Sequence, residues 1–113
     1  GIKREPILAF CQNHLSYQLL TYDEETFNKP IIALSYALLA SDATKQKISD
    51  IEDTLALAYF KNEDFFHAKE AQKRAVMLLI EGQPQSKNKT STKLIQFKNQ
   101  LKKYDDALID SAK

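Results

Sequence analysis

Apolar side chains recur at helical spacing along the first twenty or so residues of this chain. They fall every three or four positions, on one side of an α-helix, at Leu8, Cys11, Leu15, Leu19 and Tyr22. Pro6 precedes all of them and is tolerated in an opening turn, where its missing N–H is not needed. We therefore predict a first helix from about residue 6, with this stripe buried and Cys11 acting as a small buried hydrophobe.

A polar, acidic stretch separates this helix from a second one. Residues 21–29 read TYDEETFNK, which predicts a loop, and Pro30 follows as the opening residue of the next helix. Three alanines line one face of that helix, at intervals of four and three: Ala33, Ala37 and Ala40. The pattern ends near Ser41, so the sequence predicts a first helix pair over about residues 6–41.

A second pair of helices follows a short polar connection. Ser49 and Glu52 stand at the spacing of a capping box, in which each side chain satisfies a free backbone N–H at the helix start. Asp64 is a favourable N-cap for the next helix, and Gly82 is the expected stop. The side chains predicted to be buried are Ile51, Leu55, Ala58 and Tyr59, then Phe65, Ala68, Ala71, Ala75, Leu78 and Leu79. This pair is predicted over about residues 49–81.

The end of the chain predicts one long amphipathic helix. Residues 82–92 are polar, which predicts a linker. Over about residues 93–110 an apolar stripe follows through Leu94, Phe97, Leu101, Tyr104 and Leu108, with Lys93, Asn99, Lys103 and Asp106 on the polar side. We predict that this helix caps the preceding pairs. The alternatives are the start of a third pair and self-association through a coiled-coil seam.

Residues 53–77 carry the most informative pattern, two amphipathic helices that meet at a short polar corner. Small side chains fall where two closely packed helices need them: Ala56, Ala58, Ala68, Ala71 and Ala75. Ala56 and Ala68 stand twelve residues apart, and Glu63-Asp64 forms the corner. This segment resembles a tetratricopeptide (TPR) repeat, a helix-turn-helix unit. The glycine usual at that corner is missing, so the chain must turn without a residue that tolerates positive φ cheaply.

The first helix pair resembles a longer copy of the same repeat. Ser16 takes the place of Ala56, and Ala33 follows seventeen residues later, five more than in the second pair. The extra residues are expected to bulge out as an acidic loop. The resemblance is to a bacterial-type TPR-like domain with an extended first repeat. It implies an all-α fold of about two antiparallel helix-turn-helix repeats, closed by the C-terminal helix.

Composition adds bounds to this picture. A chain of 113 residues predicts one domain, and two glycines with three prolines are too few for an all-β fold. No run of eighteen apolar residues occurs, so no membrane span is expected. The chain starts without Met or an apolar signal core, so we expect a piece of a longer protein. Its single cysteine excludes an internal disulfide and favours the cytoplasm, with the periplasm as the alternative.

Residues that could carry chemistry are sparse. His14 and His67 stand far apart, with no acids or cysteines at ligand spacing around them, so no metal site is expected. The carboxylate pair Asp105-Asp106 falls on a helix face, whereas general acid–base catalysis needs a dry pocket. Two glycines do not make a phosphate-binding loop. We therefore expect no enzymatic activity and no cofactor.

Charge is polarised along the chain. Residues 1–70 carry seven Lys and Arg against eleven Asp and Glu, whereas residues 82–113 carry seven Lys against three Asp. Residues 85–104 hold six lysines and no acid. Binding of nucleic acid or of an anionic surface is therefore the alternative function. The segment has no arginine, the better reader of phosphates, so we favour a solvated lysine face that docks near the acidic body.

The resemblance implies a protein-interaction module. In TPR arrays the first helix of each pair lines a concave face, and the partner-binding candidates here are Phe10, Asn13, Tyr17, Asp53, Leu57 and Phe60. The apolar ones would be exposed until a partner covers them; the alternative is that Leu57 and Phe60 pack under the last helix. The implied partner is a peptide, a protein or a neighbouring domain of the same chain, which would be a monomer or weak homodimer. An accessory role beside a catalytic domain is a third option.

Overall fold

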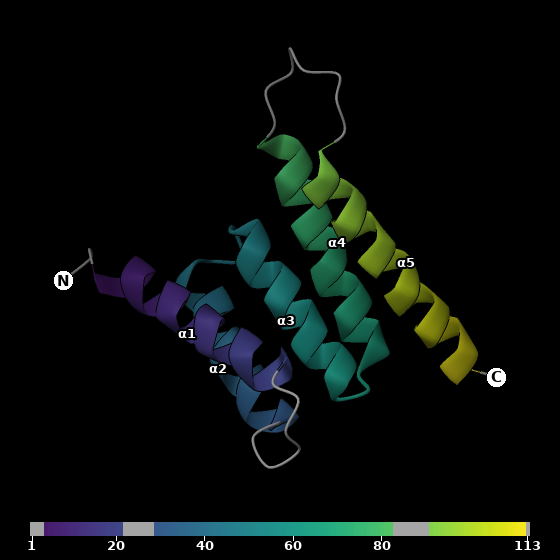
Figure 1. Cartoon of the computed structure of the whole chain (residues 1–113), viewed down its shortest axis with the longest axis horizontal. Helices are drawn as coiled ribbons and strands as arrows, with labels where there is room; N and C mark the ends of the chain where they lie inside the picture. The colour runs from purple at the N-terminus through teal and green to yellow at the C-terminus, as the bar shows by residue number, and fades with distance from the viewer. Residues whose placement is uncertain (1–3, 22–28, 83–90, 113) are drawn as a thin grey trace.

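The computed structural model describes residues 4–21, 29–82 and 91–112, and every regular element in these ranges is a helix. The helices are α1 (Arg4–Thr21), α2 (Pro30–Ala43), α3 (Ser49–Lys61), α4 (Phe65–Glu81) and α5 (Thr92–Ser111). α1 and α2 form one antiparallel pair, α3 and α4 form a second, and α5 runs along α4 (Figure 1). The predicted all-α fold, with two helix pairs and a fifth helix, is confirmed.

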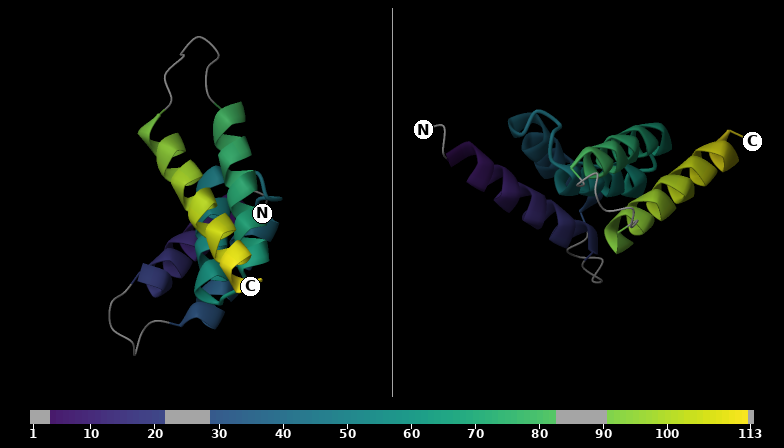
Figure 2. Two further views of the ribbon diagram at one scale, coloured as in Figure 1. Left: turned by 90° about the vertical axis from the view of Figure 1, so that its right-hand side faces the viewer. Right: turned by 90° about the horizontal axis from the view of Figure 1, so that it is seen from above.

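The helices follow one another in space as they do in sequence. α3 contacts both members of the first pair, and α1 and α5 lie on opposite sides of the molecule in Figure 1 and in the right-hand view of Figure 2. Buried side chains from all five helices join in one core: Leu20, Ala33, Leu55, Ala71 and Tyr104. This layered arrangement leaves the outer sides of the first and last helices without a neighbouring helix pair.

Small side chains set the spacing within each pair. Ala33, Ala37 and Ala40 on α2 are fully buried, as predicted, and so are Ala56 and Ala68 in the second pair. A side chain that ends at Cβ lets one helix backbone come close to another. The alanine positions that the sequence singled out are therefore the positions at which the helices meet.

The buried side of α1 is not the predicted one. Of the predicted stripe, Leu8, Cys11 and Leu15 are exposed, Leu19 is half-buried and Tyr22 lies outside the described residues. The helix instead buries Ala9, Ser16 and Leu20, each one position further along. The reason is the close approach of α2, which leaves room mainly for small side chains on the facing side. Hydrophobicity alone gave the right period but the wrong face, because it ignores side-chain size.

The capping box predicted at the start of α3 is also wrong. Ile48 is the N-cap residue, and no side chain caps this helix. Glu52 points into the protein instead, and its side chain is fully buried. Its Oε2 accepts a hydrogen bond from Ser41 Oγ at 2.7 Å, and its Oε1 accepts one from Arg74 Nε at 3.0 Å. A buried carboxylate needs such partners, and only the folded chain brings them together.

The predicted limits of α4 are confirmed. Asp64 is the N-cap residue and accepts a hydrogen bond from the backbone N–H of His67 at 3.2 Å. The helix ends at Glu81, with Gly82 as its C-cap. The corner before it turns at Glu63, whose φ of 62° lies in the left-handed region. A residue with a Cβ adopts that conformation at a cost of about 1–2 kcal/mol, as the missing glycine implied.

α5 is one uninterrupted helix, as predicted, and it packs along α4. Its apolar stripe has Leu94, Phe97 and Tyr104 buried, with Leu101 and Leu108 half-buried. Gln72 on α4 donates a hydrogen bond from Nε2 to the carbonyl of Phe97 at 3.1 Å. The stripe that would form a coiled-coil seam is therefore already covered within the chain. Of the predicted linker, residues 83–90 lie outside the described residues.

Candidate functional site

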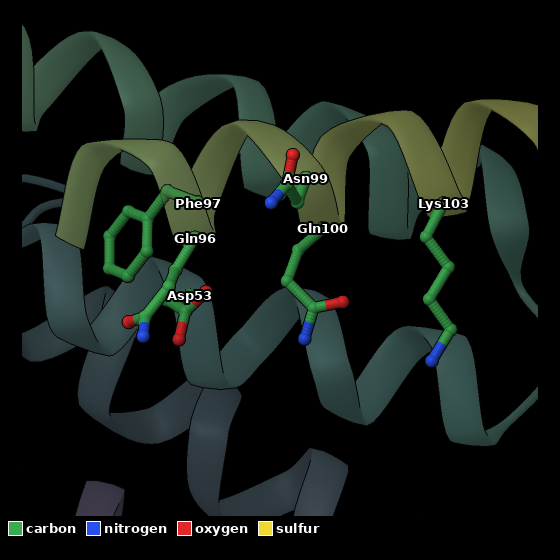
Figure 3. A pocket seen from close by; sticks show the side chains of 6 residues that line it. All are labelled: Asp53, Gln96, Phe97, Asn99, Gln100 and Lys103. Carbon is green, nitrogen blue, oxygen red and sulfur yellow. The ribbon is translucent and has the colours of Figure 1, made fainter. Parts of the chain in front are cut away.

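A hollow of about 470 Å³ lies between α3 and α5. Asp53 of α3 lines one side of it. The other side comes from α5, which contributes Gln96, Phe97, Asn99, Gln100 and Lys103 (Figure 3). In the close view, the side chains of Gln96, Gln100 and Lys103 extend from α5 toward α3.

A second hollow continues the first toward the C-terminal ends of both helices. It has a volume of about 530 Å³ and is lined by Phe60, Asn99, Lys102, Lys103, Asp106, Ala107 and Asp110. Asn99 and Lys103 line both hollows, so the two form one trough. We call it the α3–α5 groove and define it by Asp53, Phe60, Gln96, Asn99, Gln100 and Lys103.

An aromatic contact joins the two helices beneath this groove. The ring centroids of Phe60 on α3 and Tyr104 on α5 lie 4.9 Å apart, and Phe65 packs on the other side of Phe60 at 5.5 Å. Lys103 Nζ lies 4.9 Å from the centroid of the Phe60 ring, within the range of a cation–π interaction. Phe60 thereby fixes the distance between α3 and α5 and forms an apolar floor beside Lys103.

Three amide side chains line the α5 wall of the groove. Asn99 and Gln100 follow Gln96 by three and four residues, which places both next to Gln96 on the helix surface. Each carries two N–H donors and one carbonyl acceptor. Within the described part of the chain, none of these three side chains makes a hydrogen bond that would occupy these groups. The wall therefore offers both donors and acceptors to a bound molecule.

Asp53 is the partly buried acid of the groove. Burial raises the pKa of its carboxyl above the ordinary value, and the nearby Asp50 carboxylate adds to this shift. The nearby Gln72 side-chain amide and the positive charge of Lys93 lower that pKa in part. Burial, with a smaller contribution from the charge of Asp53, also raises the pKa of the Tyr104 hydroxyl. The polar groups at this end of the groove are thus electrostatically coupled.

The three candidates predicted on α3 reach the groove to different degrees. Asp53 and Phe60 line it. Leu57 is half-buried and packs against the main core. The expectation that Leu57 and Phe60 are exposed is wrong, because both are half-buried under α5 and the core. For Phe60 the alternative, packing under the last helix, is confirmed.

The three candidates on α1 do not line the α3–α5 groove. Phe10 and Tyr17 are each 49% exposed, whereas Asn13 is half-buried. Its Oδ1 is buried and has no hydrogen-bond partner among the described residues. Of the six predicted residues, the structure therefore places Asp53 and Phe60 in the groove and leaves Leu57 and the three α1 residues outside its lining.

Sequence reasoning missed the contribution of α5 to this site. Asn99 and Lys103 were expected on a solvent-facing polar side, and Gln96 and Gln100 were not singled out. Their three-four spacing next to the apolar stripe was the available signal. It indicated a second surface of the helix, but it did not show that this surface faces α3.

A cluster of lysines lies on another side of α5. Lys69, Lys73, Lys98 and Lys102 line a hollow of about 290 Å³ between α4 and α5, together with Leu101 and Asp105. Lys69 Nζ pairs with Asp105 Oδ1 at 2.9 Å. At the start of α5, Lys93 Nζ pairs with Asp50 Oδ1 at 2.6 Å. Lys93 of the lysine-rich segment thus docks on an acid of α3, in line with the docking favoured from sequence.

The histidines and cysteine form no recognisable reactive centre. His67 Nδ1 lies 2.7 Å from Asp64 Oδ2 on an exposed helix start, and His14 contacts Gln18. Over residues 4–21, 29–82 and 91–112, no group of three or more His, Cys, Asp or Glu side chains is placed to hold a metal ion. Among the same residues, no helix combines the length and the apolar character needed to cross a bilayer.

Comparison with known proteins leaves the geometry as the only guide to function. Searches against protein-family models, curated proteins and solved structures found no match to this chain.

Proposed function

We propose that this chain is a protein-interaction module of TPR-like repeats and that it binds a peptide segment or a partner domain in the α3–α5 groove. The observation that carries the proposal is the wall of three unengaged amides, Gln96, Asn99 and Gln100, opposite Asp53. A peptide backbone presents one N–H donor and one C=O acceptor at nearly every residue. Side-chain amides match that alternation, because each one both donates and accepts.

The charged side chains in the groove would favour particular side chains in a bound peptide. Asp53 lies in the first hollow and Lys103 lines both, whereas Lys102, Asp106 and Asp110 lie in the second. A bound segment with a basic side chain near Asp53 gains a favourable charge interaction there. Small-molecule sites are mostly apolar with a few placed polar groups, whereas five of the six residues that line the first hollow carry charged or amide side chains. The proposal assigns no catalytic role and no cofactor to the chain.

The exposed side chains on α1 extend the proposed surface. Phe10 and Tyr17 belong to the first helix of the first pair, as Asp53 and Phe60 belong to the first helix of the second. α1 and α3 are in contact. A partner longer than the groove would continue from α3 toward α1 and cover these two aromatic rings. Aromatic side chains such as these are enriched in protein–protein interfaces.

Peptide selection followed by substitution tests this proposal. A random peptide library displayed on phage would be selected on the full chain, and the recovered peptides measured by fluorescence anisotropy. The double variant Gln96→Ala/Gln100→Ala should weaken binding by about 10- to 30-fold, since each hydrogen bond contributes about 1 kcal/mol. The matched control is Gln18→Ala, an exposed glutamine on α1 outside the groove. Equal affinity of the selected peptides for the double variant and for Gln18→Ala would contradict binding in the groove.

The lysine cluster between α4 and α5 supports a second candidate, the binding of nucleic acid or of another polyanion. Lys69 is paired with Asp105, but Lys98 and Lys102 make no ion pair within the described residues. A labelled DNA duplex would be titrated at several salt concentrations. Affinity that falls steeply with salt, and that is lost in Lys98→Ala/Lys102→Ala, would favour this function over peptide binding.

A further inference from the structure

Asp53 is the acid of the first hollow in the α3–α5 groove, and it has no cation as a partner. Within the described part of the chain it forms no ion pair. The charge of Lys93 reaches it, but Lys93 Nζ pairs with Asp50 at 2.6 Å instead. The side chain is half-buried, and burial raises the pKa of its carboxyl. A carboxylate that has lost part of its water is stabilised by a nearby positive charge.

A buried acceptor without a donor lies behind Asp53. Gln72 on α4 is fully buried, and its Nε2 donates a hydrogen bond to the carbonyl of Phe97 at 3.1 Å. Its amide also lies near the Asp53 carboxyl. Oε1 of this amide is buried and has no hydrogen-bond partner among the described residues. Since Asp53 and Phe97 both line the first hollow, this end of the groove has unused acceptors, which suit a ligand group rich in N–H donors.

Lys103 is an unpaired charge of the opposite sign. Its Nζ lies 4.9 Å from the centroid of the Phe60 ring, and its side chain extends toward α3 (Figure 3). Asp106 follows it by three residues on α5, but neither Asp106 nor any other acid in the described ranges forms an ion pair with it. An ammonium group has three N–H donors, so contact with a ring leaves it able to bind an anion.

The separation of the two charges fits a short stretch of extended chain. Asp53 and Gln96 lie at one end of the hollow in Figure 3, and Lys103 lies at the other. Gln96 and Lys103 are seven residues apart on α5, or about 10 Å at a rise of about 1.5 Å per residue. An extended chain advances about 3.3 Å per residue and turns alternate side chains to one side. Two residues therefore span about 7 Å and four about 13 Å, and long side chains make up the difference.

We infer that the α3–α5 groove binds an extended segment with an arginine or lysine at Asp53 and an aspartate or glutamate at Lys103, two or four residues apart. The inference rests on the proposed function, because it needs a peptide in the groove. Arginine suits the first position best, since its planar guanidinium can give a carboxylate two hydrogen bonds at once. A segment with charges of one sign is attracted at one end of the hollow and repelled at the other, so the pair of opposite charges sets the specificity.

Selection from a random peptide library on phage tests the inference, with the full chain as bait. Peptides recovered on the wild type should be enriched in a basic residue two or four positions from an acidic one. Asp53→Asn should remove the enrichment of the basic residue, and Lys103→Gln should remove that of the acidic one. Circular dichroism should show unchanged helix content in both variants. The matched controls are Asp42→Asn and Lys61→Gln, exposed residues of α2 and α3 outside the groove, which should recover the wild-type pattern.

Fluorescence anisotropy of a labelled peptide from the wild-type selection gives the second measurement. Replacing its basic residue by glutamine should weaken binding to the wild type about tenfold. The same replacement should change binding to Asp53→Asn less than about twofold, because the partner charge is already gone. Replacing the acidic residue of the peptide should weaken binding about two- to fivefold, as for an exposed ion pair, and only where Lys103 is present.

The possible results separate this inference from the proposed function. Peptides that lose affinity in Gln96→Ala/Gln100→Ala but carry no pair of opposite charges would overturn the inference and leave groove binding in place. Equal effects of Asp53→Asn and Asp42→Asn on the recovered peptides would also overturn it. Recovery of no peptide that depends on the groove would contradict both.

Discussion

The hydroxyl of Ser16 donates a buried hydrogen bond to the carbonyl oxygen of Ala33, at 2.7 Å and across seventeen residues of chain. The bond joins α1 to α2. Ser16 is fully buried, and so is Ala33. Two requirements meet at this position. The side chain must be small enough for the gap between the helices, and its buried hydroxyl must find a hydrogen-bond acceptor.

Substitutions at Ser16 should separate these two requirements. Ser16→Ala keeps the size and removes the bond, which should lower the free energy of unfolding by about 1 kcal/mol. Ser16→Leu adds volume at the contact and should cost about 1–3 kcal/mol or more. Urea denaturation followed by circular dichroism measures both. If Ser16→Leu proved as stable as Ser16→Ala, the close approach of α1 and α2 would be ruled out.

The buried carboxylate of Glu52 depends on Arg74. Arg74→Ala leaves that carboxylate with Ser41 as its remaining partner in the described structure, and it should destabilise the chain by about 3 kcal/mol. This value is at the low end of the destabilisation expected when a buried ion pair loses one partner, because the Arg74 side chain is 35% exposed. The control Lys73→Ala removes a neighbouring exposed charge and should change stability by less than about 0.5 kcal/mol.

Replacing both members of this pair tests whether the charge itself is needed. Glu52→Leu/Arg74→Met removes the buried charge together with its partner and should recover most of the stability lost in Arg74→Ala. Together with Glu52→Leu and Arg74→Met as single variants, the double variant completes a double-mutant cycle. A double variant less stable than Arg74→Ala would show that Glu52 contributes more through Ser41 than through Arg74.

The corner at Glu63 should gain from a glycine. Glu63 has a φ of 62°, and glycine relieves the strain of that conformation, while it also loosens the unfolded chain by about 0.4–1 kcal/mol. We expect Glu63→Gly to stabilise the chain by up to about 1 kcal/mol, seen as a rise in Tm. Lys61→Gly, the same change inside the last turn of α3, should lower Tm instead.

Stability should depend on the ionisation of Asp53. Its pKa is raised in the folded chain above the ordinary 3.8, chiefly by burial, so the folded state holds this proton more tightly than the unfolded state does. The contribution of Asp53 is therefore most favourable below 3.8 and is lost as the pH rises through its folded-state pKa. Asp53→Asn should abolish this loss and make the chain more stable than wild type at pH 7. Tm measured from pH 3 to 7, with exposed Asp106→Asn as control, tests the sign.

Local signals indicated several of the helix ends correctly. Pro30 opens α2, Asp64 caps α4 and Gly82 follows its last residue. Each depends on groups within a few residues of itself, so no knowledge of the fold was needed. The pairing of Ser16 with Ala33 and the strained corner at Glu63 also followed from the sequence, because the spacing of small residues and a missing glycine indicated them.

The residues that line the groove were predicted only in part. Asp53 and Phe60 were predicted as binding residues and line the groove, but Gln96 and Gln100 were not predicted. Periodicity identified the apolar side of α5 correctly. It left open which of the remaining surfaces would lie beside α3, since that depends on the angle at which α5 crosses α4.

The sequence by itself determined the number of helices, most of their limits and the alanine contacts, since these depend on local capping and on helical period. Tertiary structure decided which side of α1 is buried, where the Glu52 carboxylate points and which side chains of α5 face α3. Each of these depends on how closely two helices approach, and that distance is set by residues far apart in the chain. Helical period restricts a side chain to one stripe, but only a packed neighbour selects the stripe that is covered.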